Sequence, residues 1–192
     1  MHPRAHYAFT VKFMDKKQAL VSYIVDLEPA KTVLHRPLYF YGGALHTALQ
    51  YVPTRYLPGT IAHLVQDAYW DSHVRKHLKV KGNIWVHRLH EAFWTRKYFS
   101  RTSIDFDMDF ITRYLGFYGI VDLKETMKHI ELIEWLIEGP EEDVKEYFWK
   151  LIGHEIEPEP ERIDEFFSWK EFENMMYELF SSNHQEALSL PV

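Results

Sequence analysis

The residue types best suited to chemistry lie together between His73 and Arg101. This stretch has eight lysine and arginine residues and one acid, Glu91, in a chain whose formal net charge is −6. Aromatic residues lie among these charges, and they are Trp85, Phe93, Trp94, Tyr98 and Phe99. Cations that neutralise phosphates, beside rings that stack on bases, are typical of proteins that bind single-stranded nucleic acid. The stretch is therefore a candidate surface for single-stranded RNA.

We assign RNA contacts to the cations and rings of this stretch that are best placed to reach a strand. They are Lys79, Lys81, Trp85, Arg88, Trp94, Arg96, Lys97, Tyr98 and Arg101. In the alternative interpretation the aromatic rings belong to the core, and the lysine and arginine stems extend over them toward water.

Twelve histidines raise the question of a metal site. His63 and Asp67 are spaced four apart, as are His73 and His77, so each pair shares one face of a helix. No His-Glu-x-x-His or paired Glu-x-x-His motif accompanies them. We predict no metal ligand, no cofactor and no catalytic residue, and a helical metal-binding protein that uses these four residues stays an alternative.

One enzymatic alternative is metal-independent cleavage of RNA, in which a base activates the 2′-hydroxyl group. His87, His90, Lys97 and Tyr98 lie where the RNA backbone would pass. The same residues would bind phosphate without cutting the strand, so cleavage ranks below binding. The chain has no cysteine, which excludes disulfides and thiolate zinc sites.

Charge is distributed unevenly along the chain. Residues 1–121 have a formal charge of +7, whereas residues 122–178 have −12. A basic first part suits a polyanion, and an acidic last part suits a basic neighbouring subunit. The same asymmetry fits another alternative, an acidic adaptor that docks on a protein complex; a virus-encoded decoy that docks in this way is an alternative that follows from the family resemblance given below.

The elements expected to position these residues are a mixture of strands and helices. Alternating polarity predicts strands at 6–13 and 104–110, and apolar composition predicts further strands at 83–93 and 130–137. Helices are predicted after Gly42, from Thr60 to about residue 78, over 140–152 and after Ser168. The predicted fold class is α+β, a ferredoxin-like (RRM-like) antiparallel sheet with helices on one face and a helical C-terminal extension. Residues 1–153 would form the RNA-binding domain and residues 154–192 an acidic connector, a final helix and a loose tail.

The hydrophobic pattern also bears on where the protein works. No window approaches the roughly 18 uninterrupted apolar residues of a membrane helix, and the start of the sequence lacks the apolar core of a signal peptide. We expect a cytoplasmic protein with no membrane partner.

Several segments resemble a known family in the same order along the chain. The segments are residues 7–13, the run from Gly42 to Leu49, the run from Leu57 to Leu64, and residues 130–154 with their Glu138-Gly139-Pro140 turn. They are similar to the CRISPR-associated RAMP superfamily, in particular to the subunit that holds the 5′ handle of the guide RNA in small type IV complexes. Trp85 to Arg101 stands where that branch has its aromatic and basic stretch.

The resemblance implies a ferredoxin-like RNA-binding subunit whose partners are single-stranded RNA and the other subunits of a ribonucleoprotein complex. The family's glycine-rich loop after the last helix is replaced here by the acidic run from Glu155 to Pro160. That departure leaves room for a diverged or decoy relative.

Overall fold

The computed structural model describes residues 1–32, 52–78 and 83–181, and within these ranges every regular element is helical. The longer helices are α1 (Pro3–Thr10), α2 (Lys16–Ile24), α5 (Leu57–Trp70), α6 (Ile84–Phe99), α7 (Met108–Phe117), α8 (Lys124–Glu138), α9 (Glu141–Ile152) and α11 (Trp169–Phe180). Short turns are η2 (Thr54–Tyr56), a π-helix η3 (Asp71–Arg75) and α10 (Glu161–Asp164). The predicted α+β, ferredoxin-like fold is wrong, because the described residues contain no strand from which a sheet could form.

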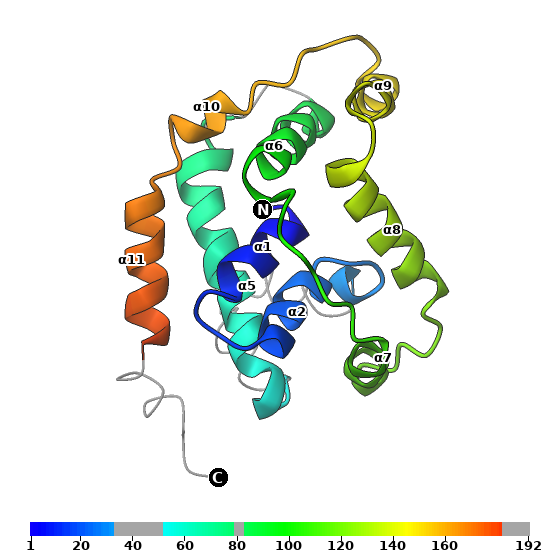
Figure 1. The fold of residues 1–192 in the computed structure, drawn as a ribbon, viewed down its shortest axis with the longest axis vertical. Coiled ribbons are helices and arrows are strands. Elements are labelled where there is room, and N and C mark those ends of the chain that lie inside the picture. Colours follow the sequence, from blue (N-terminus) through cyan, green and yellow to red (C-terminus); the bar gives the residue numbers. More distant parts are fainter. Residues whose placement is uncertain (33–51, 79–82, 182–192) are drawn as a thin grey trace.

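Helices α1, α2 and α5 pack on one another at the centre of the molecule (Figure 1). Helix α6 contacts α1 on one side and α8, α9 and α10 on others. Helix α11 lies along the outside of this group, and its Phe172 ring packs on Phe9 of α1 and Tyr69 of α5. None of the helices in the described ranges has a stretch long and apolar enough to span a bilayer.

The predicted strand at 6–13 is helix α1 and the turn that follows it. Pro3 occupies the first turn and the His2 side chain caps it, and both features favour the start of a helix. Every residue of α1 is buried, including the polar His6 and Thr10. The alternation of polarity was misleading because the polar residues face other buried polar groups instead of water.

The other predicted strands are also wrong. Residues 130–137 lie inside α8, where Ile130, Ile133 and Ile137 are buried at helical spacing. In 104–110 the chain is irregular until the Asp107 side chain accepts a hydrogen bond from the Phe110 amide and starts α7. Residues 83–93 begin α6, where the Asn83 side chain accepts from the Trp85 amide.

Three predicted helices are confirmed. α9 covers 141–152 and ends at Gly153 in the left-handed region, at φ 92°. Ser168 caps α11 by accepting a hydrogen bond from the Glu171 amide. The helix placed at 60–78 begins at Leu57, because Pro58 sits in its first turn, and continues from Trp70 into η3. The helix predicted after Gly42 lies outside the described residues.

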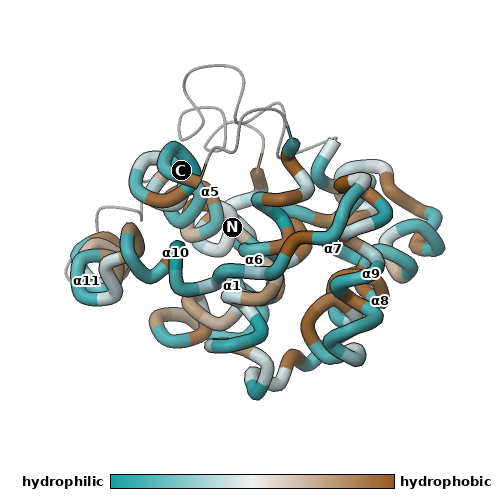
Figure 2. Tube along the Cα trace, turned by 90° about the horizontal axis from the view of Figure 1, so that it is seen from above, coloured by the Kyte–Doolittle hydropathy of each residue, from teal (hydrophilic) through white to brown (hydrophobic). Residues whose placement is uncertain are grey.

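Two apolar clusters hold these helices. The larger joins α1, α2, α5, α7 and α11, and the smaller joins α6 to α8 and α9 through Leu89, Phe93, Val144 and Phe148. Figure 2 shows hydrophobic and hydrophilic residues following one another along the same helices, as expected for helices with one face buried. Where the polar residues of α1, α5 and α6 face inward together, a buried polar cluster forms.

Candidate metal centre

The basic aromatic stretch lies mostly on α6, and much of it faces other parts of the protein. Trp94 is fully buried, and its Nε1 donates to Asp164 Oδ1 at 2.8 Å, so neither face of the indole is open to a base. Tyr98 donates to the other oxygen of Asp164 at 2.8 Å and Lys97 pairs with it at 3.0 Å. Helix α10 therefore covers this end of α6 with an acid that contacts three of the predicted RNA-binding residues.

The other residues predicted to bind RNA lie in different surroundings. Arg96 donates to the carbonyl oxygens of Leu136 and Gly139, where it caps the C-terminal end of α8. Arg88 pairs with Glu91 at 2.8 Å, Trp85 is 40 % exposed, and Arg101 is exposed. Lys79 and Lys81 lie outside the described residues. The ferredoxin-like sheet is absent from the described ranges, so the RNA-binding and CRISPR-family expectations find no support in the fold.

A buried cluster of histidines and acids lies where α1, α2 and α5 meet. His6, His63 and Asp67 each offer one ligand atom, and these atoms lie within 4.8 Å of one another. His6 Nε2 is 3.1 Å from Asp67 Oδ1, and His63 Nε2 is 3.3 Å from Asp67 Oδ2. No other group of three such residues lies this close in the described ranges. We call His6, His63 and Asp67 the central triad.

Each histidine of the central triad is oriented by a hydrogen bond from its far ring nitrogen. His6 Nδ1 lies 2.8 Å from the amide oxygen of Gln66, and His63 Nδ1 lies 2.8 Å from the backbone oxygen of Ser22. Both oxygens only accept, so Nδ1 carries the hydrogen and Nε2 of each neutral ring presents a lone pair. Gln66 is itself held, because its Nε2 donates to Thr10 Oγ1 at 2.9 Å.

Asp26 extends the triad toward the surface. Its Oδ2 lies 3.7 Å from His6 Nε2, and its Oδ1 accepts from Lys31 at 2.6 Å. Burial acts to raise the pKa of Asp26, but the charges of Lys31 and His63 outweigh it and hold that pKa below its usual range. Asp26 is therefore a carboxylate at neutral pH and a candidate fourth ligand.

Burial and the neighbouring charges shift the pKa values of the two triad histidines in opposite directions. Burial and the neighbouring His63 lower the pKa of His6 to about 4. Burial also acts to lower the pKa of His63, but Asp67 and Asp26 outweigh it and raise that pKa. Two ring nitrogens and a carboxylate converging on one point favour a cation there, and the raised pKa of His63 reflects the same negative charge of Asp67 and Asp26.

Helix α6 brings a second histidine and acid beside the triad. His87 and Glu91 are spaced four apart, with Nε2 and Oε2 3.8 Å from each other, and Glu91 is 1 % exposed. The N-terminal ammonium group of Met1 pairs with both acids, at 2.9 Å from Asp67 Oδ1 and 3.5 Å from Glu91 Oε1. Burial lowers the pKa of His87 to about 4, so its ring is neutral at pH 7.

The other histidines considered from the sequence lie elsewhere. His73 stacks on Tyr69 and faces Glu171, and His77 stacks on Phe166 at the surface, so neither reaches His63 or Asp67. His90 accepts a hydrogen bond from the Glu159 amide. Sequence reasoning missed His6, because residues 6–13 were predicted to form a strand and no local spacing links His6 to His63 and Asp67.

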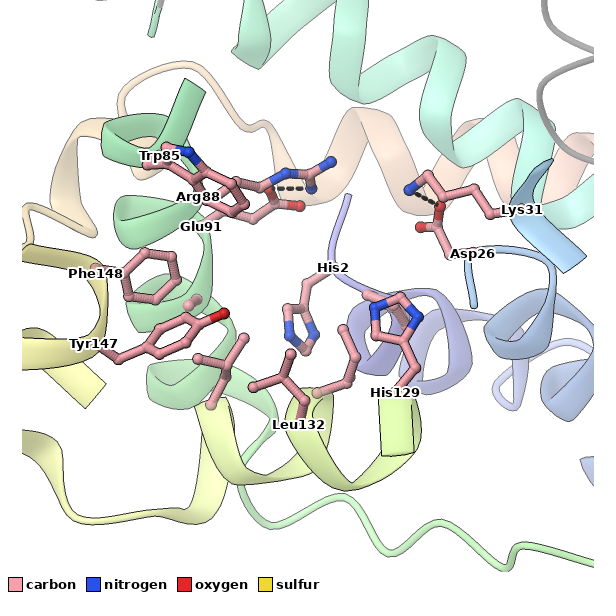
Figure 3. Close-up of a pocket in the computed structure, with 14 residues that line it drawn as sticks. His2, Asp26, Lys31, Trp85, Arg88, Glu91, His129, Leu132, Tyr147 and Phe148 are labelled. Atoms are coloured by element: carbon pink, nitrogen blue, oxygen red, sulfur yellow. Dashed lines mark hydrogen bonds and ion pairs between the residues drawn. The ribbon is translucent and has the colours of Figure 1, made fainter. Parts of the chain in front are cut away.

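A pocket of about 210 Å³ adjoins the cluster on the far side of Asp26. Its polar lining includes His2, Asp26, Lys31, Arg88, Glu91 and His129. Its apolar lining includes Trp85, Leu132, Leu136, Tyr147 and Phe148 from α6, α8 and α9. Figure 3 shows the Tyr147 and Phe148 rings on one side of this space and the pair of Asp26 and Lys31 on the other.

Such an arrangement has the parts of a hydrolytic metal site. The triad offers two imidazole nitrogens and a carboxylate, Asp26 offers a further oxygen, and the pocket offers space for a small molecule beside them. Comparison of the chain with protein-family models, with curated proteins and with solved structures gave no match, so the geometry carries the functional argument.

Proposed function

We propose that this protein is a metal-dependent hydrolase whose metal is held by His6, His63 and Asp67, with Asp26 as the fourth ligand. The substrate is a small anionic ester that enters through the pocket bordered by Asp26. Two histidines and a carboxylate are a common ligand set for catalytic zinc, in which water takes the fourth position, so with Asp26 bound the water would enter as a fifth ligand.

The observation that carries the proposal is the orientation of the two imidazoles. Metal-bound histidines almost always donate their other ring hydrogen to a carbonyl or carboxylate group, which fixes the tautomer and the plane of the ring. His6 does so to Gln66 and His63 does so to Ser22, each at 2.8 Å. The Nε2 atoms of His6 and His63 then lie 3.1 and 3.3 Å from the two carboxylate oxygens of Asp67.

A divalent cation would fit the charge of this cluster. Asp26, Asp67 and Glu91 are three buried acids, and in this structure they pair with Lys31, the Met1 ammonium group and Arg88 respectively. A bound metal would place a double positive charge among these carboxylates, and His63 would bind it as the neutral ring. A zinc ion bound here would lower the pKa of its water ligand to about 7 and would polarise an ester oxygen of the substrate.

Elemental analysis of protein purified without an affinity tag tests the metal site. We expect about one equivalent of zinc, iron or manganese in the wild type and its loss in His63→Gln. The matched control is His73→Gln, which removes a histidine outside the cluster and should keep the metal. Circular dichroism of both variants checks that they fold.

Activity is measured in parallel with 4-nitrophenyl phosphate before and after treatment with a chelator. Turnover that disappears with the chelator and returns with added metal is the expected result. A folded, metal-free wild type that takes up no metal on dialysis against zinc, iron or manganese would overturn the proposal. The cluster would then be a structural set of buried ion pairs.

A further inference from the structure

The pocket beside Asp26 has a buried hydrogen-bond donor that nothing in the described protein satisfies. His2 Nδ1 accepts a hydrogen bond from the Arg4 amide, so the hydrogen of the neutral ring is on Nε2. Nε2 is buried and has no hydrogen-bond partner in the described residues, and His2 is 5 % exposed. Buried polar groups normally have a partner, and because His2 is one of the residues that line the pocket, its Nε2 is the donor that we assign to an acceptor oxygen of a ligand.

Two cations flank the same space. Arg88 comes from α6 and Lys31 from the segment after α2, and Figure 3 shows their charged ends directed toward each other across the pocket. Each is paired with an acid of the lining, Arg88 with Glu91 and Lys31 with Asp26. The charges of these four groups cancel, so a divalent metal at Asp26 would make the pocket positive. Anion binding should therefore depend on the metal.

The opposite side of the pocket is apolar and aromatic. Tyr147 and Phe148 of α9 belong to one apolar cluster with Leu132 and Leu136 of α8, and Trp85 of α6 also lines the pocket. A cavity of about 150 Å³ holds a benzene molecule. The 210 Å³ of this pocket therefore suits one ring with a small charged head, and it is below the usual size of sites for drug-sized ligands.

We propose that the substrate is a small organic phosphate with a flat apolar group, whose phosphate accepts a hydrogen bond from His2 between Arg88 and Lys31 while its ring packs against Tyr147. The inference rests on the proposed function, because the metal provides the positive charge that attracts the phosphate. It adds the class of substrate and the residues that select it.

The test compares two non-hydrolysable probes, phenylphosphonate and methylphosphonate, by isothermal titration calorimetry. Both are titrated into protein whose zinc content has been measured, and into the same protein after chelation. We expect the phenyl compound to bind roughly 10- to 100-fold more tightly than the methyl compound, because only the former buries a ring. Neither should bind measurably to the metal-free protein.

Two variants test whether the preference for the phenyl compound arises in this pocket. Tyr147→Ala should remove most of the preference for the ring and leave the affinity for methylphosphonate unchanged. Tyr177→Ala, which removes an exposed tyrosine of α11 away from the pocket, should keep the preference. The zinc content of each variant is measured, so loss of metal is not mistaken for loss of the ring contact.

The possible failures are distinguishable. Zinc-loaded protein that binds both phosphonates equally, or binds neither, overturns the substrate class and leaves the metal centre in place. A preference for the ring that persists in folded Tyr147→Ala overturns the assignment to this pocket. Protein that takes up no zinc overturns the proposed function and this inference with it.

Discussion

Replacing Gln66 by leucine tests whether the central triad is a metal site or a set of buried ion pairs that binds no metal. Gln66 touches no metal ligand atom directly, but it holds His6 through Nδ1 at 2.8 Å and is itself held by Thr10 at 2.9 Å. Leucine has a similar size and makes neither bond. The His6 ring would lose the contact that fixes its tautomer, while both Nε2 atoms and Asp67 remain present.

The structure sets the expected magnitudes. The substitution removes two buried hydrogen bonds and leaves the His6 Nδ1 hydrogen without an acceptor, which together cost about 3 kcal/mol in the metal-free protein. For a chain of this length that corresponds to a decrease in Tm of roughly 6 to 12 °C. Loss of such an outer contact typically lowers metal affinity by roughly 10- to 100-fold, or about 1.4 to 2.7 kcal/mol.

The assay is a competition titration of zinc against a chromophoric chelator, together with thermal unfolding with and without zinc. Gln18→Leu is the matched control, because Gln18 also makes two hydrogen bonds, to the Arg55 oxygen and from the Gly59 amide, away from the cluster. It should lower the Tm and leave zinc affinity unchanged. If Gln66→Leu also lowers only the Tm, His6 is not an oriented metal ligand and our reasoning is refuted.

Further predictions concern the packing that supports the site. In Gly59→Ala the new Cβ would clash with the backbone oxygen of Gln18 and approach Val21, so α5 must move away from α2. We expect the free energy of unfolding, measured with urea, to fall by about 1 to 3 kcal/mol. An unchanged urea midpoint would show that the contact between the two helices adapts. Trp94→Phe removes the bond to Asp164 and part of a fully buried ring, and should destabilise the fold by about 1 to 3 kcal/mol while zinc content stays the same. Altered zinc content in a folded Trp94→Phe would mean that α10 and the metal centre are coupled. Arg96→Met should weaken the last turn of α8 by about 1 kcal/mol, seen as faster hydrogen exchange there, because the Leu136 and Gly139 carbonyl oxygens lose their donor. Exchange that stays slow would show that water replaces the guanidinium.

Local sequence determined where several helices begin and end. Pro140 and three acids before an apolar stripe predicted α9, Gly153 marked its end, and Ser168 with Glu171 marked the start of α11. These signals act within one turn of helix, through caps, dipole and backbone conformation, so they can be read without the fold. The shared face of His63 and Asp67 was predicted for the same reason, since spacing of four on a helix is a local property.

The tertiary structure decided the fold class and completed the candidate site. Helix α1 is buried on every side, so its polar residues mark no solvent face, and the alternation of polarity resembled a strand. His6 and Gln66 are 60 positions apart in the chain, and Asp26 follows another helix, so only packing brings them to His63 and Asp67. Packing likewise buried Trp94 under α10 and placed Asp164 beside Lys97, because helix α10 crosses this end of α6, and residues 70 positions apart meet only in the folded chain.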